Sequence, residues 1–97
     1  MELEQLRLFA AVAEAKSFSA AARSLFVSHS TTSRAVSALE RELGVELLSR
    51  QGKTVTPTPA GEELLRRAKA LLGAAEEAKA AVTAFQNREN RGENETP

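Results

Sequence analysis

The chain has 97 residues, 42% of them hydrophobic and 27% charged, and lacks a bilayer-spanning apolar run or a signal peptide, so we expect a single folded cytoplasmic domain without a membrane partner. Cysteine and aspartate are absent and His29 is the single histidine, which excludes disulfides, a Ser-His-Asp triad and a multi-histidine metal site; we therefore expect no enzyme, no metal and no cofactor. Thirteen basic residues balance thirteen acidic ones, so net charge alone predicts neither a nucleic-acid nor a membrane partner.

Two helices are predicted in the first part of the chain. Residues 3–15 carry apolar side chains at the spacing of a helix with one buried face. Ser17 and Ser19 are both candidate N-caps for a short second helix over residues 20–26, whose alanines and Leu25 are expected to be buried. Small residues on this helix would let another helix approach closely.

A third helix is predicted from Ser28 or Ser30 to about residue 43, with Gly44 where a left-handed C-cap is favoured. On a helical wheel one side of it carries the residues that we expect in the core, or packed against it: Thr32, Val36, Leu39 and Leu43. The opposite side is short and polar, and it carries Ser30, Ser33, Arg34, Ser37 and Arg41.

A small hairpin is predicted after Gly44. Two short extended runs, near residues 46–50 and 53–56, flank the turn signal Gln51-Gly52. We call this two-stranded hairpin the wing.

The last helix is predicted from Pro59, with Thr58 as its N-cap, to between residues 85 and 88. Its apolar residues are spaced alternately by four and three positions, which is a heptad seam. We expect this seam to form a homodimer through Leu64, Ala68, Leu71, Leu72, Ala75, Ala78, Val82 and Phe85. The alternative is packing back on the first helix, which we expect only in part, over residues 64–71. Residues 89–97 are polar and are expected to be a disordered tail.

The start of the third helix is rich in hydroxyl side chains, which are poor helix formers. A capped and solvated helix end is the simplest explanation. Short side chains, however, also let a helix lie close against DNA, hydroxyls can meet phosphates or base edges, and a helix N-terminus favours a phosphate. Residues 16–54 carry six basic and three acidic side chains. Because a short helix and a tight turn precede this helix and a wing follows it, we favour a winged helix-turn-helix whose third helix enters the major groove.

A specific order of motifs runs through residues 3–88. It comprises Ser17-Phe18, Ala21-Ala22, Leu25, Val27-Ser28, Ser33, Leu39-Glu40, Leu43-Gly44, Leu47, Arg50, Thr58 and Ala60-Gly61. This order resembles the N-terminal DNA-binding region of LysR-type transcriptional regulators. The resemblance implies a mainly α fold, with a winged helix-turn-helix over residues 1–58 and a linker helix over residues 59–88 that pairs in a dimer. It also implies a pseudo-palindromic operator of double-stranded DNA.

Family members carry an effector-binding domain after the linker helix, and in a full-length form the dimer can assemble into a tetramer. Only a polar tail follows the linker helix in this chain. We therefore expect either an excised DNA-binding domain or a short regulator, with no small-molecule site in this chain.

The chain departs from the family pattern at four positions. Family members usually have Gln at the place of His29, often Pro at Ser30, Phe at Leu48 and Leu at Pro57. The last two are expected to be mild packing or turn changes. His29 is expected to affect base preference, because an imidazole cannot make the bidentate amide contact to adenine that Gln makes.

The candidate site combines helix starts with the wing. The predicted DNA-binding residues are Ser17, Ser28, His29, Ser30, Thr31, Ser33, Arg34, Ser37, Arg50, Lys53 and Thr54. Capping is an alternative or additional role for Ser17 and Thr31, a solvated position is the alternative for Arg34, and an exposed tip without a contact is the alternative for His29.

Two functions from different classes remain open. The first is a sequence-specific, dimeric transcription regulator that binds double-stranded DNA. The second is a short protein-interaction module that forms mixed dimers with full-length relatives through residues 64–85, which the neutral net charge suggests. Retardation of an operator duplex in a gel would distinguish the two.

Overall fold

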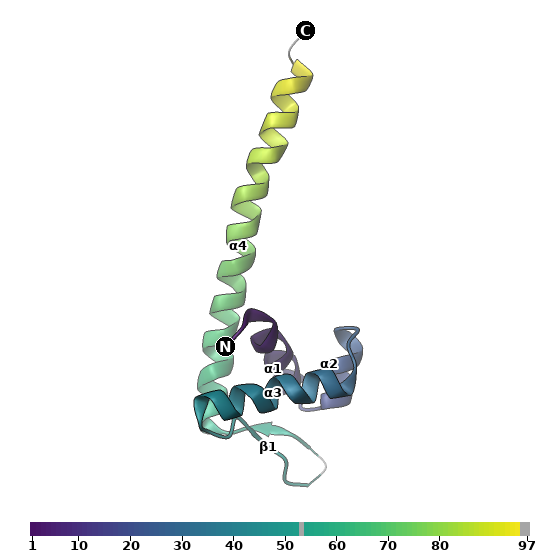
Figure 1. The fold of residues 1–97 in the computed structure, drawn as a ribbon, viewed down its shortest axis with the longest axis vertical. Coiled ribbons are helices and arrows are strands. Elements are labelled where there is room, and N and C mark those ends of the chain that lie inside the picture. Colours follow the sequence, from purple (N-terminus) through teal and green to yellow (C-terminus); the bar gives the residue numbers. More distant parts are fainter. Residues whose placement is uncertain (53, 96–97) are drawn as a thin grey trace.

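The computed structural model describes residues 1–52 and 54–95, with side chains described as far as Gln86 apart from Lys53. Figure 1 shows a helical head, a long helix that rises from it, and a small hairpin at the other end. The elements in chain order are α1 (Leu3–Ala15), α2 (Phe18–Ser24), α3 (His29–Leu43), β1 (Leu48–Ser49), β2 (Thr56–Pro57) and α4 (Pro59–Glu95). The predicted class, a mainly helical winged helix-turn-helix with a long last helix, is confirmed.

Side-chain and glycine caps fix the ends of the head helices. The Ser17 hydroxyl oxygen accepts the amide N–H of Ala20 at 3.0 Å, so α2 begins earlier than predicted. The Ser28 hydroxyl oxygen accepts the amide N–H of Thr31 at 3.0 Å and starts α3. Gly44 ends α3 in the left-handed region with φ of 69°, which a glycine adopts without steric cost. Ser17 and Ser28, rather than Ser19 and Ser30, are therefore the caps.

The core lies where α1, α2, α3 and the base of α4 meet, and α1 contacts each of the other three helices. Its buried members are Leu6, Phe9, Val12, Ala13, Phe18, Ala21, Val36, Leu39, Leu47, Leu48 and Ala68. The predicted core positions Leu25 and Leu43 need correction: Leu25 is half-buried and Leu43 is 42% exposed. Both lie at helix ends, where the chain turns away from the core.

The wing is an antiparallel pair of very short strands. The paired residues are Leu48 with Pro57 and Ser49 with Thr56. Both strands are shorter than predicted and the second begins later, because the amide N–H of Val55 donates to the carbonyl oxygen of Lys16 at 3.4 Å. This bond ties the loop to the end of α1. Gly52, with φ of 77°, occupies the predicted turn, and Lys53 lies outside the described residues.

α4 begins against the segment that leads from α3 into β1. The Thr58 hydroxyl donates to the carbonyl oxygen of Glu46 at 2.6 Å and accepts the amide N–H of Gly61 at 3.0 Å. Gly61 is buried so tightly that a Cβ built there would lie 1.9 Å from the carbonyl oxygen of Leu47. The glycine that slightly weakens this helix is therefore what allows the helix to pack on the head.

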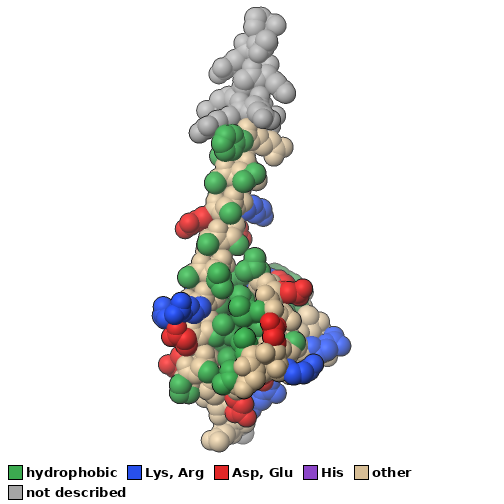
Figure 2. Space-filling model, turned by 60° about the vertical axis from the view of Figure 1, so that its left-hand side comes forward, with side chains coloured by type: hydrophobic (Ala, Val, Ile, Leu, Met, Phe, Trp, Pro, Cys, Tyr) green, Lys and Arg blue, Asp and Glu red, His purple; other side chains and the backbone are tan. Residues whose placement is uncertain are grey.

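The base of α4 packs on α1, and the rest projects away from the head (Figure 1). Ala68 is fully buried inside the monomer and Leu64 is half-buried against the same core, so the expected partial packing of residues 64–71 on the head is confirmed for these two. The predicted place of Ala68 in a dimer seam is therefore wrong. Figure 2 shows hydrophobic side chains continuing along α4 beyond the head. No helix of the described residues is long and apolar enough to cross a membrane.

α4 extends past its expected end at residue 88 to Glu95. It therefore covers residues 89–95 of the predicted disordered tail, while residues 96 and 97 lie outside the described residues. Adding residues to an existing helix avoids the cost of nucleation, and the Glu and Arg residues of this segment are good helix formers, unlike its Gly92 and two asparagines.

We predict that Gly61→Ala destabilises the fold by about 1–3 kcal/mol, because the new methyl group collides with the backbone of Leu47. The matched control is Gly73→Ala in the same helix, where a Cβ meets no atom of the described structure within 4 Å. That change should stabilise the protein by up to about 1 kcal/mol through helix propensity. Urea denaturation of both variants measures the two effects, and equal effects at the two sites would contradict the close contact.

Candidate nucleic-acid interface

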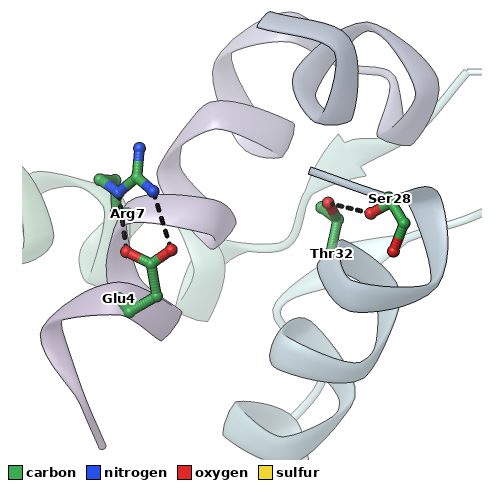
Figure 3. A network of polar contacts seen from close by, with 4 residues as sticks. All are labelled: Glu4, Arg7, Ser28 and Thr32. Atoms are coloured by element: carbon green, nitrogen blue, oxygen red, sulfur yellow. Dashed lines mark hydrogen bonds and ion pairs between the residues drawn. The ribbon is translucent and has the colours of Figure 1, made fainter. Parts of the chain in front are cut away.

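The N-terminal half of α3 turns its polar side outward, because the other side of the helix is buried in the core. Thr32, Val36 and Leu39 are completely buried, as the helical wheel predicts. The Thr32 hydroxyl donates to the carbonyl oxygen of Ser28 at 3.0 Å, so this buried polar group is satisfied (Figure 3). The helix is thereby held by one face while the other stays free.

The side chains at the helix starts that are predicted to contact DNA fall into two groups, the cap hydroxyls and the side chains without a hydrogen-bond partner among the described residues. The hydroxyls of Ser17, Ser28 and Thr31 are engaged in capping: besides accepting a backbone N–H, the Ser28 hydroxyl donates to that of Thr31 at 2.8 Å. The second group makes no side-chain hydrogen bond within the part of the chain that the structure describes. Its members are Ser30, Ser33, Arg34 and Ser37, with Ser30 and Arg34 exposed and the other two half-buried.

The wing and α3 enclose a shallow groove of about 420 Å³. Ser37 and Glu40 line it from α3, and Ser49, Arg50 and Gln51 line it from the wing. The groove therefore brings the free face of α3 together with the base of the wing. Thr54, also predicted as a contact, is exposed in the wing loop.

Glu40 links α3 to the start of the wing, at Leu47 and the first residue of β1. Its carboxylate oxygen Oε2 accepts the amide N–H groups of Leu47 at 2.8 Å and Leu48 at 3.3 Å. This negative side chain in the groove is therefore used structurally. The sequence interpretation did not assign this role, since the partners are backbone groups that only the folded turn brings close.

One aromatic ring joins three elements beside this surface. Phe18, at the start of α2, is 9% exposed. The Arg50 guanidinium carbon lies over the ring, 4.8 Å from its centroid. The exposed His29 ring lies 5.7 Å from the same centroid at an interplanar angle of 41°. Two predicted contact residues, one from α3 and one from the wing, are thus held against a side chain that the sequence interpretation left out of the site.

A second surface lies on α4 and is apolar. Leu71, Val82 and Phe85 are 44%, 69% and 61% exposed. Nearer the head, a groove of about 300 Å³ runs between the start of α1 and α4, and its apolar lining includes Leu3 and Leu72. The hydrophobic side chains on α4 lead from the head along the projecting helix (Figure 2).

Charged side chains border this apolar groove. The Arg7 guanidinium donates to both carboxylate oxygens of Glu4 at 2.8 Å (Figure 3). These hydrogen bonds lower the pKa of Glu4 and raise that of Arg7. The Glu4–Arg7 part of the border therefore remains charged at neutral pH. Near the start of α4, outside this groove, hydrogen bonds from Arg67 and then Arg66 lower the pKa of Glu63.

Metal binding has no visible basis in this surface. No group of three or more His, Asp or Glu side chains that could hold a metal ion occurs among the side chains that the structure describes. The surface offers hydroxyls, guanidiniums and the His29 imidazole, which suit phosphate oxygens and base edges. The groove also contains the carboxylates of Glu40 and Glu46 and the amide of Gln51.

We predict that Glu40→Ala destabilises the protein by about 1–3 kcal/mol, because two partly buried backbone N–H groups lose their acceptor. Glu77→Ala, which removes an exposed carboxylate from α4, is the matched control and should change stability by less than about 0.5 kcal/mol. Thermal and urea denaturation measure both. A Glu40→Ala variant as stable as the control would show that the link contributes nothing.

A family model described as "Bacterial regulatory helix-turn-helix protein, lysR family" matches residues 3–62. A probable HTH-type transcriptional regulator, LrrA of Synechococcus elongatus, is 50% identical over 72 residues, which are 74% of this chain and 24% of that protein. A probable hydrogen peroxide-inducible genes activator of Streptomyces viridosporus is 53% identical over 70 residues, 72% of this chain and 22% of that protein. The chain thus spans about a quarter of the length of these relatives.

Solved structures of similar chains include complexes with DNA. The BenM DBD in complex with catB site 1 DNA superposes with a TM-score of 0.85 at 36% identity, covering 89% of this chain and 96% of that one. The CbnR DBD in complex with DNA superposes with a TM-score of 0.82 at 40% identity, covering 89% of this chain and 99% of that one.

Proposed function

We propose that this chain, which belongs to the lysR family of bacterial regulatory helix-turn-helix proteins, is the DNA-binding part of a transcription regulator and binds double-stranded DNA in a sequence-specific way as a dimer. The observation that carries the proposal is the free polar face of α3, whose buried side fixes the helix on the head. Structures of similar chains bound to DNA support it. A regulator of bacterial genes works in the cytoplasm, and we propose this location and a role without catalysis.

The proposed reading surface is the N-terminal half of α3. Ser30, Ser33, Arg34 and Ser37 are the residues whose side chains are free to bond base edges or phosphates. The cap residues Ser17, Ser28 and Thr31 use their hydroxyls to fix helix starts, and we propose that these ends approach the DNA backbone. His29 and the wing residues Arg50, Lys53 and Thr54 complete the proposed set.

The proposed dimer forms through α4 beyond residue 70. The supporting observation is the exposure of Leu71 and Val82 on a helix that projects from the head. An isolated helix with an exposed apolar seam is marginal in water, whereas two such helices bury the seam against each other. We propose that residues 1–58 bind DNA, that residues 59–88 set the distance between two heads, and that a full-length form assembles further into a tetramer.

We predict that Arg34→Ala weakens binding to the preferred duplex by about 1–3 kcal/mol if Arg34 reads a base, because its guanidinium donors are exposed on the free face of α3. The preferred duplex is obtained by selection from a random library, and gel retardation measures the affinity. The charge-matched control is Arg66→Ala on α4, which should change the affinity little. Equal affinities of Arg34→Ala and wild type would remove Arg34 from the reading surface.

We predict that Val82→Glu raises the dissociation constant of the dimer at least roughly tenfold, because a carboxylate would be buried in the seam. Ala80→Glu introduces the same charge on the opposite side of α4 and serves as the control. Sedimentation equilibrium over a range of concentrations measures the change. A dimer equally affected by both variants would argue against this seam.

A further inference from the structure

The contact of Phe18 with Arg50 and His29 brings together residues that are far apart in the sequence. Phe18 begins α2, His29 begins α3, and Arg50 follows β1. The guanidinium carbon lies 4.8 Å from the centroid of the Phe18 ring, and the imidazole lies 5.7 Å from it. The ring itself is 9% exposed and belongs to the core cluster, so a rigid part of the head carries both polar groups.

The Arg50 contact is suited to orienting a cation without using its donors. The negative face of an aromatic ring attracts a guanidinium, and the N–H groups at the rim of the guanidinium remain available for other partners. Among the described residues, Arg50 has no carboxylate within ion-pair distance and no side-chain hydrogen bond, so the ring is the contact that restrains it. A long side chain that is already restrained loses less conformational entropy on binding a ligand.

The same ring sets the position of His29. This residue is exposed and is the first residue of α3, so its imidazole stands at the end of the helix where the free hydroxyls lie. A tilted arrangement of two rings is favourable for aromatic pairs and therefore favours this orientation of the imidazole. One core side chain therefore restrains a polar group of the wing and a polar group of the helix at once.

We propose that Phe18 is a positioning residue for DNA recognition: its ring holds Arg50 and His29 in the orientation in which they meet the duplex, and so couples the wing to the start of α3. The proposal rests on the proposed function, because Arg50 and His29 must bind DNA for their orientation to matter. Phe18 does not contact the DNA itself. The competing explanation is that Phe18 only fills the core, as Val12 does at complete burial on α1.

The first experiment measures the free protein, without DNA. The order parameter of the Arg50 side-chain Nε–H vector is determined by NMR relaxation in the wild type, Phe18→Leu, Phe18→Tyr and Val12→Ala. Phe18→Leu should lower the order parameter, because the ring is gone. Phe18→Tyr, which keeps the ring, and Val12→Ala, which perturbs the core elsewhere, should leave the order parameter unchanged. An order parameter unchanged in Phe18→Leu would overturn the proposal whatever the DNA affinity is.

The second experiment measures affinity for the duplex that the wild-type chain enriches from a random library. Phe18→Leu should weaken binding roughly 3- to 30-fold, the range of a cation–π contact, and Phe18→Tyr should restore it. In a protein that already carries Arg50→Ala and His29→Ala, Phe18→Leu should weaken binding of the duplex by less than about 2-fold. Arg50→Lys tests the contact with Phe18 intact: it retains the charge but lacks the planar stacking group, so it should also weaken binding.

Two results would overturn the positioning role. The first is that Phe18→Leu lowers the affinity for the duplex equally in the wild-type protein and in the Arg50→Ala/His29→Ala protein. The second is that Val12→Ala lowers this affinity as much as Phe18→Leu does. A library that yields no enriched duplex would overturn the proposed function and, with it, the DNA role of Phe18, whereas the Arg50 order parameter would still decide whether the ring restrains the guanidinium.

Discussion

The structure depends on the burial of one side of α3. Thr32, Val36 and Leu39 lose all contact with solvent, and the buried Thr32 hydroxyl is satisfied by a carbonyl oxygen one turn earlier. This anchoring uses the apolar side of the helix and leaves its polar side without intramolecular partners over the described residues. A helix held in this way can present hydroxyls and a guanidinium at fixed positions, which is the requirement for reading the edges of bases.

The wing is tied to α3 by polar and aromatic contacts in addition to the apolar burial of Leu47 and Leu48 in the same core as Val36 and Leu39. The carboxylate of Glu40 holds the chain that enters the wing, and the ring of Phe18 contacts both the wing and the first residue of α3. A wing of two very short strands has little stability of its own. Its position beside α3 therefore depends on these contacts, which join the two halves of the proposed DNA-binding surface into one unit.

α4 changes its role along its length. At Gly61 it approaches the backbone of Leu47 closely, and at Ala68 it is fully buried against the head. Beyond that point the apolar residues of the same seam become exposed, as Leu71 and Val82 show. The first residues of this heptad pattern therefore pack in the core of their own chain, and the later ones are proposed to pack against a second chain. The direction in which the helix leaves the head is set by its buried base.

The sequence by itself determined the order and type of the elements, because helical spacing, hydroxyl caps and Gly44 act over a few neighbouring residues. It also indicated which side of α3 is buried, and the motif order indicated the family. Only the tertiary structure decided which serine caps each helix, where the wing strands pair, that Ala68 belongs to the core, and that Phe18, His29 and Arg50 meet. Apart from the choice of cap, these features depend on contacts between residues far apart in the chain, such as Val55 with Lys16 and Gly61 with Leu47. Local patterns carry no information about such distances, because the packing of whole helices sets them.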